Sequence, residues 1–280
     1  MSRLCSVGNV TIGLGCPLAI IAGPCVLESF DLGLRIGRVV RDACREHGLA
    51  YIFKASFDKA NRSSIRSVRG PGLEQGLAWI HEIGRELGVP VTTDIHAPDQ
   101  AEPAGRVIDL LQIPAFLCRQ TDLLSAAGEA ATRHKRAVNV KKGQFLSPGE
   151  MSGALRKLAE AGCTNAMLTE RGTTFGYHRL VNDFIGLKDM MELKAEPGPA
   201  PVCFDVTHST QTPGTGDTTG GRPDAAPLLA RAATAAGVHA LFIECHPEPT
   251  TAMSDASTML RLDSMPALLK QVAAIRRAIA

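Results

Sequence analysis

The residues with the clearest chemical character lie in the stretch FKASFDKANRSSIRS, at positions 53–67. This stretch directly follows an apolar run and sets four cations against one carboxylate, Asp58. The cations are Lys54, Lys59, Arg62 and Arg66, and the neutral donors beside them are Asn61, Ser63 and Ser64. Such donors suit a multiply charged anion, for example a phosphorylated sugar. A solvated basic loop would have the same composition, so the rest of the chain must decide between the two.

The overall composition is that of a globular chain with a large core. Hydrophobic residues make up 45% of the 280 residues, and 30 Lys and Arg oppose 28 Asp and Glu, for a net charge of +2. This balance provides no general field for nucleic acid, and 4% aromatic residues are too few for a base-stacking surface. We therefore expect no nucleic-acid partner, and anion binding must come from a locally built site.

The N-terminus and the cysteines both indicate a cytoplasmic protein. The opening sequence MSRLCSVGNVTIGLG lacks the apolar segment of a signal peptide, and no apolar run approaches the ~20 residues that cross a bilayer. The eight cysteines are scattered without a CxxC pair, which does not indicate a disulfide framework. We expect reduced thiols, most of them in the core, and no membrane partner.

Apolar, β-branched runs alternate with segments of helical periodicity along the whole chain. The runs lie at 18–22, 50–54, 89–95, 107–113, 137–141, 166–170, 202–207 and 240–244. Eight such units predict an α/β fold, a closed (β/α)8 TIM barrel that forms a single domain over residues 1–280. Residues 1–17 should form a short β-hairpin at the bottom of the barrel. The helix near 99–105 should be short, 192–201 should be a loop, and the Gly-rich stretch 213–221 should be a mobile loop and not a nucleotide fingerprint.

Every predicted strand delivers a polar or ionisable side chain at its C-terminal end, where this architecture places its chemistry. In chain order these are Cys25; Lys54; Asp94 and His96; Gln112 and Arg119; Lys141, Lys142 and Gln144; Glu170 and Arg171; His208; Glu244 and His246. Structural caps alone would not produce this pattern eight times. The basic stretch therefore becomes the second βα loop, at the mouth of a site.

Four of these side chains predict a divalent metal site. Cys25, His208 and Glu244 end strands one, seven and eight, which become neighbours when the barrel closes. Asp255, in the loop after strand eight, can reach the same point. One thiolate, one imidazole and two carboxylates suit Zn²⁺, Fe²⁺ or Mn²⁺ and do not select among them. A core cysteine or a loop histidine would explain each residue singly, but not their convergence.

Six motifs follow one another in the order found in a known enzyme family. They are FKASFDKANRSSIRSVRGPGLEQG, IPAFLCRQTDLL, NVKKGQF, TERGTTFGY, FDVTHS and HPEP. With them the chain resembles the 3-deoxy-D-manno-octulosonate 8-phosphate synthases over nearly its whole length. The resemblance implies a transferase, usually a homotetrameric (β/α)8 barrel, that condenses phosphoenolpyruvate with D-arabinose 5-phosphate and water and releases phosphate. The product serves the inner core of lipopolysaccharide.

The resemblance also implies roles for individual residues. Lys141 and Arg171 match residues that hold the phosphate of phosphoenolpyruvate, near the Ala115 backbone. The residues that match its carboxylate site are Lys54, Ser56, Lys59 and Gln144. Those that match the pentose-phosphate site are Asn61, Arg62 and Ser63, with Arg119 contributed by a neighbouring subunit.

Further residues are candidates for catalysis. Asp94 matches a contact to the sugar, and Gln112 is a further candidate for substrate binding. The candidate catalytic residues are Lys59, Asp94, Lys141, His208 and Asp255. Metal-independent members of the family carry Asn where this chain has Cys25, so the resemblance is to the metal-dependent type.

Two other functions remain open at this point. A 3-deoxy-D-arabino-heptulosonate 7-phosphate synthase, which uses erythrose 4-phosphate, shares the barrel, the GPC strand and the metal set. It is expected to carry a KPRTSP-like motif where this chain has KANRSS. A non-catalytic phosphosugar-binding barrel would not require four metal ligands around a cation-lined mouth.

Overall fold

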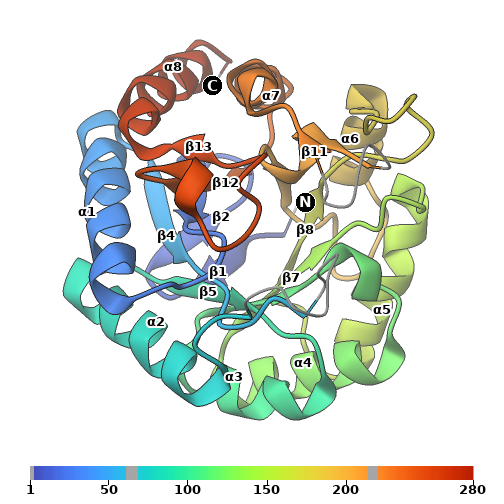
Figure 1. The fold of residues 1–280 in the computed structure, drawn as a ribbon. Helices are drawn as coiled ribbons and strands as arrows, with labels where there is room; N and C mark the ends of the chain where they lie inside the picture. Colours follow the sequence, from blue (N-terminus) through green and yellow to red (C-terminus); the bar gives the residue numbers. More distant parts are fainter. Residues whose placement is uncertain (1–2, 61–68, 214–219, 280) are drawn as a thin grey trace.

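The computed structural model describes residues 3–60, 69–213 and 220–279, which form the predicted (β/α)8 barrel (Figure 1). Its parallel strands follow one another in chain order, and the last one, β12, pairs with both β9 and β3 and so closes the barrel. The strands are β3 (Ala19–Gly23), β4 (Ala50–Lys54), β5 (Val91–Asp94), β6 (Leu110–Ile113), β7 (Ala137–Lys141), β8 (Ala166–Glu170), β9 (Val202–Asp205) and β12 (Ala240–His246).

An α-helix follows each of these strands and lies on the outside of the barrel (Figure 1). The helices are α1 (Phe30–His47), α2 (Leu73–Leu87), α3 (Ala101–Val107), α4 (Thr121–His134), α5 (Ser152–Glu160), α6 (Phe184–Met191), α7 (Ala226–Ala235) and α8 (Met265–Ile279). The predicted alternation is confirmed. The fourth predicted strand began too early, because Val107 is the last residue of the short helix α3 and β6 starts only at Leu110.

The remaining described elements are short and lie in the connections. The strands are β1 (Cys5–Val7), β2 (Val10–Ile12), β10 (Gln211–Thr212), β11 (Gly220–Gly221) and β13 (Leu260–Arg261). The 3₁₀ helices are η1 (Pro98–Gln100), η2 (Ala115–Leu117), η3 (Pro148–Met151), η4 (His208–Thr210), η5 (Pro223–Ala225), η6 (Pro249–Thr251) and η7 (Leu262–Ser264). The segment 192–201 is a loop, as predicted.

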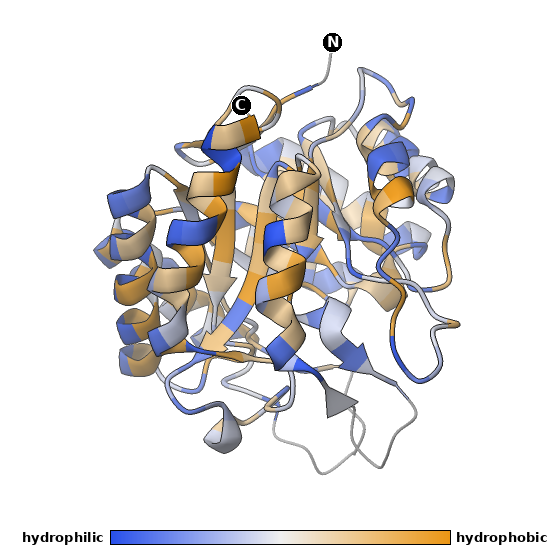
Figure 2. Ribbon diagram, turned by 90° about the horizontal axis from the view of Figure 1, so that it is seen from above, coloured by the Kyte–Doolittle hydropathy of each residue, from blue (hydrophilic) through white to orange (hydrophobic). Residues whose placement is uncertain are grey.

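The helix ends follow from their sequences. The Ser29 hydroxyl accepts a hydrogen bond from the Leu32 amide and caps the start of α1. Gly48 and Gly88 end α1 and α2 in the left-handed region, with φ of 70° and 67°, which glycine adopts without steric cost. Figure 2 shows hydrophilic residues on the outward faces of the helices and hydrophobic residues along the strands. The amphipathic helices therefore bury one face against the barrel.

The N-terminal hairpin closes the lower end of the barrel, as predicted. Strands β1 and β2 pair antiparallel, with Cys5 opposite Ile12. Their buried side chains Cys5, Val7 and Ile12 form one apolar cluster with inward-facing residues of the barrel strands. The barrel members of this cluster are Ala19, Ile21, Ile52, Leu110, Ala137, Met167, Cys203, Ala240 and Phe242. The hairpin thus completes a core that the strands alone would leave open to water.

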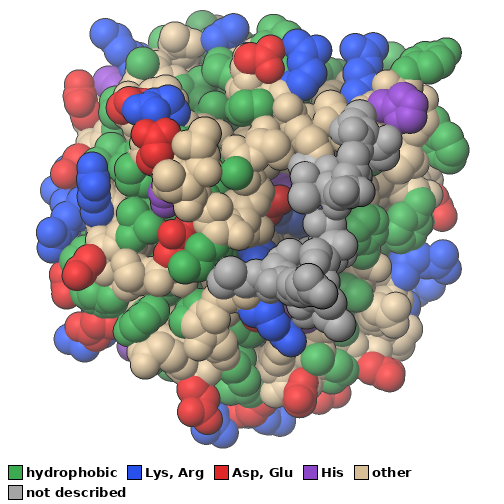
Figure 3. All heavy atoms as spheres, in the orientation of Figure 1, with side chains coloured by type: hydrophobic (Ala, Val, Ile, Leu, Met, Phe, Trp, Pro, Cys, Tyr) green, Lys and Arg blue, Asp and Glu red, His purple; other side chains and the backbone are tan. Residues whose placement is uncertain are grey.

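The outer surface carries charges of both signs. Figure 3 shows basic and acidic side chains interspersed around the face drawn there, with apolar side chains between them. This pattern agrees with the near-neutral net charge of +2. Among the described residues, no helix is both long and apolar enough to cross a membrane.

Removing the apolar contact of the hairpin should destabilise the whole barrel. Ile12 is fully buried, so Ile12→Ala is expected to lower the free energy of unfolding by about 2–4 kcal/mol, measured by urea denaturation. Leu14→Ala is the control, because this side chain is 72% exposed and its loss should change little. Equal stability of the two variants would show that the hairpin does not contribute to the core.

Candidate functional site

The interior of the barrel changes from apolar to polar along each strand. Inward-facing side chains recur every second residue, so a strand presents one at each level of the barrel. On β9, Cys203 belongs to the lower apolar cluster and Asp205 follows two residues later. On β12, Phe242 and Glu244 have the same relation. The upper half of the interior therefore collects buried charged groups at the C-terminal ends of the strands.

A cavity of about 480 Å³ lies above this polar layer. Its lining contains predicted site residues from the ends of most strands, so the structure brings these side chains together around one cavity. They are Lys59, Asp94, Gln112, Ala115, Lys141, Gln144, Arg171, His208, Glu244 and Asp255. His96 and Gln211 line the cavity as well.

The other predicted site residues lie elsewhere. Cys25, Lys54 and Ser56 are buried directly behind the lining residues, at most 1% exposed. Arg119 is exposed and does not line this cavity, and its carbonyl accepts a hydrogen bond from Lys157. The predicted pentose-phosphate residues Asn61, Arg62 and Ser63 lie outside the described residues, as does most of the Gly-rich stretch at 214–219.

Two cations of the cavity are held in place by fixed partners. Lys141 Nζ lies 2.7 Å from Asp205 Oδ2, and both side chains are buried. Arg171 Nη2 donates to Gln211 Oε1 at 2.6 Å, whereas its buried Nη1 has no hydrogen-bond partner within the described part of the chain. A buried guanidinium nitrogen without an acceptor is costly, so an anion in the cavity would stabilise it.

Lys59 and Asp94 face each other across Ser56. The Ser56 hydroxyl donates to Asp94 Oδ2 at 2.9 Å and accepts from Lys59 Nζ at 3.2 Å. Burial alone would raise the pKa of Asp94, but Lys54 and Lys59 outweigh it and hold this pKa well below its usual range. Burial opposes the charge of Lys59, yet the carboxylates of Glu244 and Asp94 raise its pKa well above the usual value. Both groups are therefore charged at neutral pH.

A chain of side-chain hydrogen bonds orients Asp94 from below. Gln112 Nε2 donates to Asp94 Oδ1, and Gln112 Oε1 accepts from Asn139 Nδ2 at 3.1 Å. Asn139 Oδ1 in turn accepts from the Thr169 hydroxyl at 2.7 Å. Because Gln112 Oε1 already accepts from Asn139, the Gln112 atom that faces Asp94 is the Nε2 donor.

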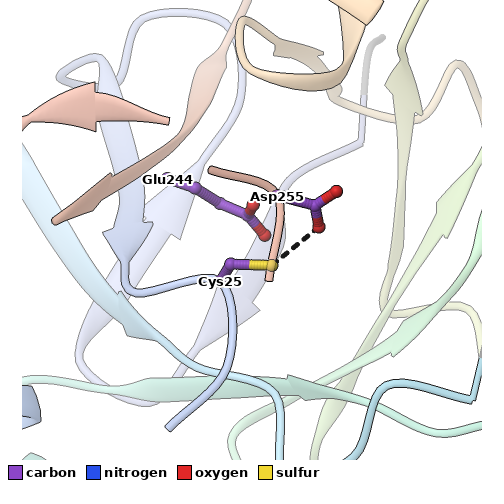
Figure 4. A group of neighbouring side chains, drawn as sticks. All are labelled: Cys25, Glu244 and Asp255. Carbon is purple, nitrogen blue, oxygen red and sulfur yellow. Dashed lines mark hydrogen bonds between the residues drawn. The ribbon is translucent and has the colours of Figure 1, made fainter. Parts of the chain in front are cut away.

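Three predicted metal ligands converge at one point (Figure 4). The ligand atoms of Cys25, Glu244 and Asp255 all lie within 4.8 Å of one another, and Cys25 Sγ is 2.8 Å from Asp255 Oδ2. Burial, followed by the charges of Asp255 and Glu244, raises the pKa of the Cys25 thiol well above its usual value. The thiol is therefore protonated and donates its hydrogen to Asp255.

His208 borders this cluster without joining it. Its Nδ1 lies 2.8 Å from Asp205 Oδ2, and its backbone amide donates to Asp205 Oδ1 at 2.9 Å. These contacts turn Nε2 toward Glu244 Oε2, at 3.8 Å. Burial opposes the charge of Asp205, but His208 and Lys141 outweigh it and keep the pKa of this carboxyl far below its usual range.

Lys54 joins the metal-ligand residues to one another. Its ammonium forms an ion pair with Glu244, in which both side chains are 1% exposed, and donates to the Cys25 carbonyl at 2.8 Å. Strands β3 and β4 can approach closely at their ends only because residue 23 is glycine. A Cβ at Gly23 would lie 1.9 Å from the Lys54 carbonyl oxygen. The ammonium is thus occupied by protein groups, and its predicted contact with a substrate carboxylate remains a prediction.

The sequence reasoning missed Asp205, although a signal was present. Asp205 is the acidic residue of FDVTHS, three positions before His208 and at an inward position of an otherwise apolar strand. A carboxylate placed there with no role would be costly to bury. Asn139 and Thr169 were missed as well, because a single polar residue in a strand does not identify its partner.

Comparison with known proteins places this chain in a family. Residues 3–279 match the model of the DAHP synthetase I family. The chain belongs to this family. It is 49% identical to the 2-dehydro-3-deoxyphosphooctonate aldolase of Desulfatibacillum aliphaticivorans, over 99% of each chain. It is 52% identical to that of Nitratidesulfovibrio vulgaris (strain DP4), over 91% of each chain, and 50% identical to that of a Synechococcus strain, over 96% of this chain and 92% of the relative.

These relatives confirm the predicted resemblance. Their name is another name for 3-deoxy-D-manno-octulosonate 8-phosphate synthase, the group that the six motifs indicated. The matches cover nearly the whole of both chains, so the resemblance is not confined to one part of the barrel.

The buried ion pair predicts a pH-dependent loss of stability. The variant Lys54→Met leaves Glu244 buried without its cation, and we expect a loss of about 3–5 kcal/mol in unfolding free energy at neutral pH. Burial opposes the charge of Glu244, but Lys54 and His208 outweigh it and lower its pKa from 4.5 to about 2. The pair therefore stabilises the protein above about pH 4.5, and its contribution is lost as the pH falls toward 2.

The measurement is urea denaturation of chelator-treated protein from neutral pH down to about pH 3, and the difference between variant and wild type should narrow once the pH falls below about 4.5. The control is Arg38→Met, which breaks an ion pair with Glu86 whose side chains are 58% and 39% exposed. This variant should lose little stability at any pH. A constant difference for Lys54→Met would show that Glu244 does not govern the effect.

Proposed function

We propose that this protein condenses phosphoenolpyruvate with D-arabinose 5-phosphate and water to give 3-deoxy-D-manno-octulosonate 8-phosphate and phosphate, in lipopolysaccharide inner-core biosynthesis. The relatives that bear the name of this activity are about half identical to this chain, over nearly its whole length. The observation that carries the proposal is the shared cavity of Lys59, Lys141 and Arg171. Both substrates are anionic, and a buried cavity with three cations binds such ligands.

Phosphoenolpyruvate is assigned to the side of the cavity formed by β7 and β8. The free Nη1 of Arg171 and the ammonium of Lys141 would bind its phosphate, with the Ala115 backbone beside them. Gln144 and Lys59, which also line the cavity, would bind its carboxylate. A guanidinium suits this task because it offers several N–H donors in a fixed plane.

The charge states of the cavity define what its residues contribute to the reaction. C3 of phosphoenolpyruvate forms the new bond to the pentose aldehyde, water adds to C2, and phosphate leaves with cleavage of its C–O bond. Asp94 is ionised at neutral pH, so it accepts hydrogen bonds from sugar hydroxyls. Lys59 is cationic and stabilises negative charge that develops between the substrates.

The enzyme is further proposed to use a divalent Zn, Fe or Mn ion held by Cys25, Glu244, Asp255 and His208. Two observations support the fit. Glu244 Oε2 is buried and has no hydrogen-bond partner within the described residues. His208 is oriented at Nδ1 by a carboxylate, as metal-bound histidines commonly are, and its Nε2 faces that same oxygen. Such an ion would polarise the sugar aldehyde and orient it.

A homotetramer is proposed as the working form, with Arg119 reaching the site of a neighbour. Arg119 is exposed in the connection after β6, three positions after Phe116, whose side chain is 54% exposed. Phe145, Phe175 and Tyr177, in the loops after β7 and β8, are 52%, 92% and 94% exposed. Large exposed aromatics on three consecutive loops support association of copies at this edge of the barrel.

A cytoplasmic location is supported by the thiols. All eight cysteines are free in the structure, and seven of them are buried. Free cysteines are typical of a reducing compartment.

The activity can be tested directly with purified protein. Phosphate release from phosphoenolpyruvate should require D-arabinose 5-phosphate, and erythrose 4-phosphate should be a poor substitute. Arg171→Ala should raise the KM for phosphoenolpyruvate by about tenfold or more, the scale of a lost charge-assisted hydrogen bond. The exposed Arg156→Ala is the control. Preference for erythrose 4-phosphate would instead favour the heptulosonate synthase, and release of phosphate from neither pair would support a binding protein.

The metal site has its own test. Cys25→Asn should lose tight metal binding, measured by elemental analysis, yet keep chelator-resistant activity, since an amide can hold the same position without binding the ion tightly. His208→Ala should not recover with any added metal. In the control Cys203→Ala, which removes a buried thiol from the lower cluster, metal content should be unchanged. Full activity of demetallated wild-type enzyme, or unchanged metal content in Cys25→Asn, would refute the metal site.

A further inference from the structure

We propose that Phe242 is a positioning residue that holds the ammonium of Lys141 toward the substrate phosphate without adding negative charge to the site. This inference rests on the proposed function, in which Lys141 binds the phosphate of phosphoenolpyruvate. The residue lies on β12, two positions before Glu244, and is fully buried. Its side chain has no polar atom, and Phe242 is not among the residues that line the cavity.

The ring forms the floor beneath the cations of the site. Lys141 Nζ lies 3.5 Å from the centre of the Phe242 ring, and Lys54 Nζ lies 5.4 Å from it. The imidazole of His208 is also near, with its centre 5.9 Å from that of the ring. An ammonium group within about 6 Å of an aromatic face is attracted by the negative charge density of the ring.

The contact fixes the direction of the remaining N–H bond of Lys141. An ammonium group has three hydrogens, and one of them points to Asp205 Oδ2, 2.7 Å away. Lys141 Nζ lies 3.5 Å from the centre of the Phe242 ring, which is close enough for a second hydrogen to point at the ring face. With two directions set by groups of the barrel wall, the third is left for the cavity that Lys141 lines. The ring therefore orients the donor before substrate arrives.

The ring also stabilises the buried ammonium of Lys141 without adding negative charge to the site. Lys141 is only 6% exposed, so its ammonium needs compensation for lost water. Asp205 supplies one negative charge but shares it with His208. A second carboxylate under Lys141 would stabilise the ammonium and at the same time repel an anionic substrate. An aromatic face gives the attraction without a net charge, so the site stays positive toward phosphate.

The position of the ring is set by the core beneath it. Phe242 belongs to the lower apolar cluster together with Val7 and Ile12 of the N-terminal hairpin. Its place is therefore determined by packing and does not depend on bound substrate. The hairpin thereby supports the floor of the site as well as closing the barrel.

The test must separate the electrostatics of the ring from its shape. Phe242→Leu removes both and risks misfolding. We therefore suggest replacing Phe242 by phenylalanines with one, two or three ring fluorines, which withdraw negative charge from the ring face while nearly keeping its shape. The dissociation constant for phosphoenolpyruvate, measured by calorimetry without the pentose, should rise with each fluorine. With three, we expect about tenfold, the effect of a lost desolvated cation–π contact.

The same substitutions at Phe204 provide the matched control. This ring is equally buried and stacks on Phe184, with ring centres 5.9 Å apart, so fluorination there should leave phosphoenolpyruvate binding unchanged. The graded loss at Phe242 alone, with a nearly constant KM for the pentose, would support the proposal. A flat series at Phe242, or equal losses at both positions, would overturn it.

A second probe keeps this result distinct from the proposed function. Turnover of the unmodified enzyme reports on the function itself. Binding of inorganic phosphate reports on Lys141 and its ring whatever the substrate is, and it should weaken across the Phe242 series in the same order. Constant phosphate affinity across that series would contradict the role of Phe242 even in a fully active enzyme.

Discussion

The buried ion pair between Lys54 and Glu244 is the interaction on which the site depends. It joins β4 to β12 across the upper interior, with both side chains 1% exposed, and through the carbonyl of Cys25 it also holds the end of β3. Separating two such charges from water is costly, and only their mutual contact and further hydrogen bonds offset that cost. The same ammonium contacts both Glu244 and the Cys25 carbonyl, so the geometry of the candidate metal site depends on a cation that is itself held by protein groups.

The barrel tolerates this many buried charges because each sign is matched within the same layer. Lys141 faces Asp205, Lys54 faces Glu244, and Lys59 reaches Asp94 through Ser56. Below this layer the interior is apolar and is closed by the hairpin. The lower half of the interior therefore supplies hydrophobic stabilisation. The upper half holds buried charged side chains, whose burial costs stability.

Much of the fold and part of the site could be predicted from the sequence, for reasons that differ by residue. The strands were visible because apolar, β-branched runs recur with helical segments between them, and barrel closure then placed Cys25 next to Glu244. The partner of Lys54 was not visible, because a strand-end lysine can face substrate or a carboxylate 190 positions away. Asn139 and Thr169 meet only through the register of neighbouring strands, and Phe242 was hidden because a phenylalanine in a strand is expected in any core.

The protonation of Cys25 connects the proposed metal to the binding of anions. In the structure its thiol donates to Asp255, and its raised pKa makes it neutral. A divalent ion bound to Cys25 would displace that proton, because the thiolate form of the side chain is the metal ligand. Such an exchange adds only one net positive charge to the cluster. In a layer where most other charges are paired, that single charge would favour the binding of two anionic substrates. Lys141, held over a neutral ring, would contribute in the same direction from the other side of the barrel floor.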